Sequence, residues 1–220
     1  MPLLEIKALN QNTSRYVWKI NESFDELFRS VALRDVSLAR LEGMKSESHQ
    51  KGFLSVRRLL MEAGYNDYDL FYDEFGKPHL TDGKHISISH SNDFSVIVIS
   101  DLMVGADLEI LKDKTIKLAP RFMDVSHLKD LSATDLLKKA TVVWGIKESV
   151  FKIKNEVGIS FKDHIFESNF NLEEQQCKVV LKFNNKEEYF DVVFDFIEDY
   201  VFVCAFNSVS LNDFSGQTQS

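Results

Sequence analysis

VGADLEI, residues 104–110, combines the apolar pattern of a buried strand with two carboxylates. Because side chains alternate between the two faces of a strand, Asp107 and Glu109 share one face, while Ala106 and Leu108 share the other. Two unpaired acids on one face repel each other and raise each other's pKa. The pattern therefore predicts either a solvated sheet edge or a cation bound at this face.

The composition is that of an ordinary globular protein. The chain has 220 residues, of which 44% are hydrophobic and 27% charged, enough for one large core or two small ones. It has no apolar run of the ~18 residues that a membrane span needs, and its start lacks the layout of a signal peptide. Two cysteines are too few for a disulfide framework. We therefore expect a cytoplasmic protein with no membrane association.

The charge of the chain is negative overall but uneven. A net charge of -8 argues against a non-specific nucleic-acid binder, which needs a basic field. Lysine and arginine are nevertheless concentrated between residues 112 and 154. This local basic surface would suit an anionic ligand or an acidic partner, although ordinary solvated helix faces explain it equally well.

Periodicity along the chain predicts helices followed by strands, twice over. Helical spacing covers residues 23–33, 37–64 and roughly 115–154. Alternating or β-branched runs cover residues 69–80, 85–91, 94–100, 102–110, 177–183 and 188–206. We expect the run 102–110 to be the third strand of the group formed by 85–91 and 94–100. The order indicates an α+β fold of two similar halves, residues 1–105 and 106–220, with a flexible tail at 207–220.

A second acidic position lies in WGIKESVFK, residues 144–152. On a helix, Glu148 and Lys152 are four residues apart and share one face, which by default makes a surface pair worth ~0.3–0.5 kcal/mol. If this face met the two acids of VGADLEI, three carboxylates would surround one point. Such a cluster suits Mg2+ bound together with substrate phosphate.

Two further stretches offer groups for an anion. In FGKPHL, residues 75–80, Lys77 presents a point charge beside a turn. In ISISHS, residues 86–91, Ser89 and His90 are hydrogen-bond donors at the end of a strand. Each stretch alone is more simply a turn and a structural histidine.

Together, GKPHL, ISISHS, VGADLEI and WGIKESVFK resemble the ordered motifs of the 4'-phosphopantetheinyl transferase superfamily, in its longer, surfactin-synthetase type. The resemblance covers residues 76–152, and the helix GFLSVRRLL extends it back to about residue 50. It implies two pseudo-twofold-related α/β halves with the active site between them. The half 1–105 would contact coenzyme A, and the half 106–220 would carry the metal-binding acids and dock the carrier protein.

The family transfers the 4'-phosphopantetheine arm of coenzyme A to a serine of an apo acyl or peptidyl carrier protein, and releases adenosine 3',5'-bisphosphate. Carried over by motif, the metal ligands for Mg2+, or alternatively Mn2+, would be Asp107, Glu109 and Glu148. Glu148 and Lys152 would be the catalytic residues, with Lys152 stabilising charge at the pyrophosphate. Coenzyme A would be bound by Lys77, Ser89 and His90, with Arg57 as an anchor for the 3'-phosphate.

Some points stay open at the level of the sequence. His127 stands where the family often has a glutamate, so the general base is either Glu148 or His127. The acceptor could belong to a fatty-acid, polyketide or peptide synthetase, and the preferred metal is undecided. Two other readings are another metal-dependent phosphate-transfer enzyme and a non-catalytic module that binds carrier proteins. We expect a monomer, because each half can bury its own sheet against that of the other.

Overall fold

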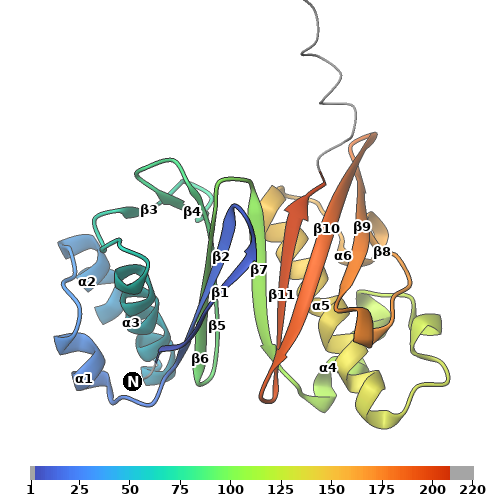
Figure 1. The fold of residues 1–220 in the computed structure, drawn as a ribbon, viewed down its shortest axis with the longest axis horizontal. Coiled ribbons are helices and arrows are strands. Elements are labelled where there is room, and N and C mark those ends of the chain that lie inside the picture. Colours follow the sequence, from blue (N-terminus) through green and yellow to red (C-terminus); the bar gives the residue numbers. More distant parts are fainter. Residues whose placement is uncertain (1–2, 209–220) are drawn as a thin grey trace, which may run out of the picture.

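Two antiparallel β-sheets stand side by side between two outer layers of helices in the computed structural model, which describes residues 3–208 (Figure 1). The first sheet, in the order β1-β2-β6-β5-β4-β3, consists of β1 (Leu3–Asn10), β2 (Thr13–Lys19), β3 (Leu70–Tyr72), β4 (Pro78–Leu80), β5 (His85–Ser91) and β6 (Phe94–Ser100). The second, in the order β7-β11-β10-β9-β8, consists of β7 (Val104–Ile110), β8 (Ile165–Glu167), β9 (Gln176–Phe183), β10 (Lys186–Ile197) and β11 (Tyr200–Asn207). The expected α+β class is thus confirmed. Of the tail expected to be flexible, residues 209–220 lie outside the described part.

Three helices cover the outer face of the first sheet: α1 (Phe24–Arg29), α2 (Asp35–Glu42) and α3 (Glu47–Glu62). The single helix expected over 37–64 is therefore two helices, because α2 ends at Gly43 and α3 begins after Ser46. Side chains of Leu54 and Leu60 from α3 pack against Trp18 and Ile97 of the sheet, and all four are at most 2% exposed. This packing fixes α3 against the outer face of the first sheet.

The outer face of the second sheet is covered mainly by one long helix, α5 (Ala133–Lys154), which lies on β7 and β11. Shorter helical segments are α4 (Asp113–Leu118), α6 (Phe161–His164) and the 3-10 turns Ala119–Arg121, Val125–Leu128 and Leu172–Glu174. The apolar side of α5 is buried as its spacing predicts, with Val143, Ile146 and Val150 fully inaccessible. Helix α5 is therefore held rigidly, and the residues on its remaining face have fixed positions.

The two sheets meet through a shared apolar layer. Val17, Val96 and Val98 of the first sheet pack there against Ala106 and Leu108 of the second. The chain passes from one sheet to the other between β6 and β7, and β7 pairs with β11. The expectation that 102–110 is the third strand of the group formed by 85–91 and 94–100 is wrong, because β7 pairs with β11 in the second sheet and meets β5 through side-chain contacts such as those of Ser87 and Ser89. The β1–β2 hairpin was not expected from the sequence.

Within residues 3–208, no helix is both long enough and apolar enough to cross a membrane.

Candidate active site

The site is built where α5 crosses β7. As the alternation predicts, Ala106 and Leu108 face the layer between the sheets, while Asp107 and Glu109 face α5. The close approach depends on glycine: a Cβ on Gly105 would lie 1.9 Å from the backbone oxygen of Ser149. A Cβ on Gly145 would likewise lie 2.6 Å from the Val203 side chain. The helix can therefore bring its polar side chains directly onto the acidic face of the strand.

Three carboxylates converge at this crossing. Trp144 Nε1 donates a hydrogen bond to Glu109 Oε1 at 3.1 Å, and Lys152 Nζ donates to Asp107 Oδ1 at 2.8 Å. Burial first, and then the charges of Asp107 and Glu148, raise the pKa of Glu109 to about 7, although Trp144 and Lys152 act in the opposite direction. Burial and the charge of Asp107 also raise the pKa of Glu148, against the effect of Lys152. The structure therefore brings together the three acids that the motifs single out.

The charges in this cluster do not balance. Asp107 is 4% exposed, and its Oδ1 accepts hydrogen bonds from Ser89 Oγ at 2.9 Å and from Lys152. Its other oxygen, Oδ2, is buried and has no hydrogen-bond partner. An unpaired buried carboxylate oxygen is costly, and a cation would remove that cost.

Within residues 3–208, no group of three or more His, Cys, Asp or Glu side chains is already arranged to hold a metal ion. The ammonium of Lys152 is instead the cation closest to Asp107. The unpartnered Asp107 Oδ2 and the raised pKa values of both glutamates nevertheless fit a hard cation that prefers oxygen ligands.

A cavity of about 290 Å³ adjoins the acidic cluster through Lys152. It lies between the halves and is lined by Lys77, His90 and Lys152, together with Arg40, Arg57 and Tyr72. Lys77 Nζ donates to the backbone oxygen of Ile153 at 2.6 Å, at the C-terminal end of α5. Arg40 and Lys77 contribute positive charge from the first half, and Lys152 contributes it from the second. The cavity is therefore suited to an anionic ligand that contacts both halves.

Ser89 and His90 are neighbours in the sequence but have different surroundings. The Ser89 hydroxyl accepts from the Leu108 amide at 3.3 Å and donates to Asp107, so that it links β5 to β7. His90 lines the cavity, where burial, and then the charges of His49 and Lys152, lower its pKa. Its ring fits against α3 at Gly52, where a Cβ would lie 3.0 Å from His90 Nδ1. His90 is thus placed to meet a ligand, and Ser89 to orient an acid.

Arg57, the expected anchor for a phosphate, is already engaged by neighbouring side chains of the protein. It is 3% exposed, its Nε donates to Asp67 Oδ1 at 3.1 Å, and its guanidinium lies 3.4 Å from the centre of the Phe53 ring. The cavity contains another arginine that sequence reasoning missed, Arg40, which is exposed and lies over the Tyr72 ring at 4.5 Å. In the sequence Arg40 looks like any polar residue of an amphipathic helix, so only the fold singles it out.

His127 lies away from this cavity. It is 3.4 Å from Glu167, which also pairs with the buried Lys147, and it lines a separate hollow with both of them. His127 is therefore a neighbour of a buried ion pair and does not line the cavity that holds Lys77 and His90.

Comparison with known proteins gives related sequences over part of the chain. The 4'-phosphopantetheinyl transferase gsp of Aneurinibacillus migulanus is 29% identical over 143 residues, which are 62% of this chain and 58% of that protein. A 4'-phosphopantetheinyl transferase of Bacillus subtilis is 32% identical over 84 residues, and the transferase Sfp of Bacillus subtilis strain 168 is 31% identical over 84 residues; each match covers 36% of this chain and 38% of the relative.

The matched region thus spans between two fifths and three fifths of the length of these relatives. No protein-family model matches the sequence. The names of these relatives nevertheless agree with the family that the motifs between Lys77 and Lys152 resemble, and the chain is similar in sequence to these 4'-phosphopantetheinyl transferases.

Proposed function

We propose that this protein transfers the 4'-phosphopantetheine group from coenzyme A to a serine of an apo acyl or peptidyl carrier protein, in an Mg2+-dependent reaction. The observation that carries the proposal is the convergence of Asp107, Glu109 and Glu148 beside a cavity lined by cationic side chains from both halves. The names of the related proteins support the same class of reaction.

The three acids would hold Mg2+, with Mn2+ as the alternative. When bound, such an ion neutralises the negative charge of the diphosphate and of its departing oxygen. Asp107 and Glu109 are fixed on β7, and Glu148 lies on α5, near enough for the charge of Asp107 to raise its pKa. Ser89 and Trp144 orient Asp107 and Glu109 through hydrogen bonds of 2.9 and 3.1 Å.

The remaining side chains bind and neutralise the substrate. Lys77 uses one donor on Ile153 and has two left for phosphate oxygens, and His90 lies in the same cavity. In the reaction, the serine Oγ forms a bond to phosphorus, and the bond from that phosphorus to the oxygen of adenosine 3',5'-bisphosphate breaks. The serine proton passes to Glu148, and Lys152 stabilises the charge on the departing oxygen. Because phosphoryl transfer mainly requires positioning and charge neutralisation, these roles are sufficient.

We assign the contacts with coenzyme A to residues 1–105, and the metal-binding acids and the carrier dock to residues 106–220. The lysine-rich segment between residues 111 and 140 would receive an acidic carrier surface. The two halves would be related by a pseudo-twofold axis, since each has an antiparallel sheet with helices on its outer face. We further propose that the protein acts as a monomer in the cytoplasm.

Incubation with an apo carrier protein, coenzyme A and Mg2+ tests this proposal. Mass spectrometry should show the carrier gaining the mass of phosphopantetheine, and a carrier whose acceptor serine is replaced by alanine should gain none. Glu148→Gln should transfer far less under the same conditions. A panel of fatty-acid, polyketide and peptide-synthetase carriers would identify the acceptor class, and no added mass on any of them would contradict the proposal.

A further inference from the structure

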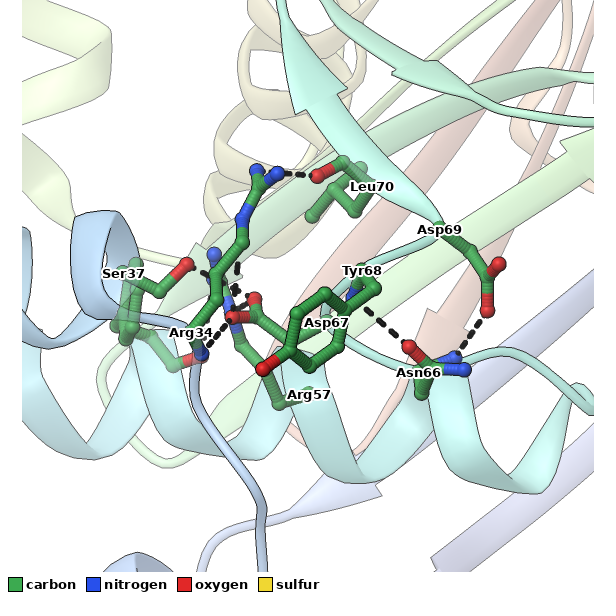
Figure 2. Close-up of polar contacts among 9 residues, drawn as sticks. Arg34, Ser37, Arg57, Asn66, Asp67, Tyr68, Asp69 and Leu70 are labelled. Atoms are coloured by element: carbon green, nitrogen blue, oxygen red, sulfur yellow. Dashed lines mark hydrogen bonds and ion pairs between the residues drawn. The ribbon is translucent and has the colours of Figure 1, made fainter.

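A buried carboxylate outside the acidic cluster joins two helices that form part of the cavity. Asp67 lies in the loop before β3 and is 2% exposed. Figure 2 shows its carboxylate between Arg34, Ser37 and Arg57. Oδ2 accepts from the Arg34 backbone amide at 3.0 Å, and Oδ1 accepts from Ser37 Oγ at 3.0 Å and from Arg57 Nε at 3.1 Å. One side chain therefore ties the start of α2 to the middle of α3.

Helix α2 depends on this contact at its N-terminus. Its N-cap residue, Arg34, makes no capping hydrogen bond with its own side chain, and Asp67 supplies an acceptor for that end from a distant segment. The Arg34 guanidinium donates instead to the backbone oxygen of Leu70 at 2.5 Å, at the start of β3 (Figure 2). The position of α2 relative to β3 and α3 is thus set by polar contacts around Asp67.

The two cavity arginines differ in how far they are already engaged. Arg57 donates to Asp67 and to the backbone oxygen of Phe53, and its flat face covers the Phe53 ring. Arg40, on α2 and about one and two-thirds turns beyond its N-cap Arg34, forms none of the ion pairs found among residues 3–208 and contacts Tyr72 of β3. A guanidinium on an aromatic ring, with its hydrogen-bonding edge free, is well placed to bind a phosphate.

Arg40 also shares its cavity with Lys77, His90 and Lys152. Lys152 contacts Asp107, so the positive charges of Lys152, Lys77 and Arg40 line a cavity that begins at the acidic cluster, where the diphosphate would lie. One ligand that reaches from this cluster to Arg40 needs a second anionic group. Coenzyme A has such a group in its 3'-phosphate.

We infer that Arg40 is the specificity-determining contact for the 3'-phosphate, and that Asp67 is a positioning residue that holds α2 so that Arg40 faces the cavity. This inference rests on the proposed function. Arg57 then supports the wall of the cavity: it fixes Asp67 and Phe53 and leaves phosphate binding to Arg40. The assignment gives a structural reason for a buried charge pair between α3 and the loop before β3.

Calorimetric titration with coenzyme A and with dephospho-coenzyme A, which lacks the 3'-phosphate, tests the inference without any transfer reaction. The native protein should bind coenzyme A about 10- to 100-fold more tightly than dephospho-coenzyme A, the range expected for a charge-assisted contact. Arg40→Ala should remove this preference and leave the affinity for dephospho-coenzyme A unchanged. Arg29→Ala, which changes an exposed arginine on α1, is the matched control and should retain the full preference.

Asp67→Asn preserves shape and should lose part of the preference, again without changing the affinity for dephospho-coenzyme A. A merely structural role would weaken both ligands alike. If Asp67→Asn does not fold, Ser37→Ala removes one of the hydrogen bonds to Asp67 and tests its positioning role instead. The assignment of the 3'-phosphate contact to Arg40 is tested by Arg40→Ala in either case. Equal losses for both ligands in Arg40→Ala, or no loss for either, would overturn the inference while the proposed function stands. A native protein that binds neither ligand would overturn both.

Discussion

Two adjacent residues of α5, Lys147 and Glu148, have opposite electrostatic surroundings. Lys147 is 2% exposed and donates to Glu167 Oε2 at 2.5 Å and to the backbone oxygen of Ile165. Glu148 is grouped with Asp107 and Glu109, two further acids. The first pair is neutral and its ammonium has two hydrogen-bond acceptors, whereas the second group has more negative than positive charge.

The contrast distinguishes Lys147, a buried charge whose partner stabilises the fold, from Glu148, a buried charge surrounded by other acids that a bound cation would neutralise. Burial lowers the pKa of Lys147, and the charge and hydrogen bond of Glu167 oppose this shift. For Glu148, burial and Asp107 act together to raise the pKa, and only Lys152 opposes them. A protein gains nothing in stability from a group of like charges, so the acidic cluster is expected to serve binding.

Breaking the neutral pair should have the largest effect on stability. Glu167→Ala leaves the Lys147 ammonium buried without its partner, and we expect the free energy of unfolding to fall by about 3–5 kcal/mol. Urea denaturation would measure the loss. Glu148→Ala is the matched variant from the acidic cluster and should cause no loss, because it removes a repelling charge. Similar losses in both variants would mean that the two groups do not differ as described.

Disrupting the acidic cluster should act on the reaction instead. Asp107→Asn keeps the hydrogen bond with Ser89 but removes the charge that would face the metal, so transfer to a carrier protein should fall at least about 100-fold. Melting of the metal-free variant should occur at or above the native temperature. Asp25→Asn, at an exposed site on α1, should keep full turnover. Full turnover in Asp107→Asn would remove Asp107 from the set of metal ligands.

The stability of the metal-free protein should depend on pH through Glu109. Its pKa is about 7 in the folded protein, against 4.5 for the ordinary group. Between these values the folded state binds more protons than the unfolded state, so the free energy of unfolding falls as the pH rises. With allowance for partial exposure, we expect a decrease of about 1–3 kcal/mol.

Urea titrations without divalent ions, from about pH 5 to about pH 8, would measure this fall. Glu109→Gln should flatten the profile, and Mg2+ added at the upper end should restore part of the stability of the native protein. Parallel profiles for the native protein and the variant would show that Glu109 titrates in its ordinary range.

The acidic face of the site was predictable because it depends on local rules. Alternation along a strand puts Asp107 and Glu109 on one face, and a spacing of four residues puts Glu148 and Lys152 on one helix face. The hairpin at 69–80 and the β5–β6 hairpin follow from turn residues and alternation in the same way. Such rules need only a few neighbouring residues.

The parts that sequence reasoning missed depend on contacts between distant segments. The pairing of β7 with β11, about a hundred residues away along the chain, has no local signature, and the sequence therefore suggested that β7 belongs with the neighbouring strands 85–91 and 94–100. Arg57 and Arg40 differ because the fold buries Arg57 against Asp67 and Phe53 and leaves Arg40 exposed over Tyr72. Which strand pairs with β7, and which side chains contact each arginine, is decided only when distant segments pack together.

The smallest expected effect is on Mg2+ affinity and concerns Trp144, whose indole orients Glu109 in the acidic cluster. Trp144→Phe should keep the edge contacts of its ring with Phe122 and Phe161 but lose the indole N–H that donates to Glu109. Loss of such an outer-shell hydrogen bond typically weakens metal binding by about 10-fold. The shift of the melting temperature with Mg2+ concentration would measure the affinity without any transfer reaction.

The second tryptophan of the chain provides the matched control. Trp18 Nε1 donates to Glu22 at 3.4 Å, and its ring lies in the core beneath α3, on the far side of the first sheet from the layer that holds β7. Trp18→Phe should therefore leave the Mg2+ dependence of the melting temperature unchanged, even if it lowers that temperature overall. Equal Mg2+ affinities in the two variants and the native protein would show that Glu109 keeps its orientation without the indole, and that packing alone fixes the acidic face.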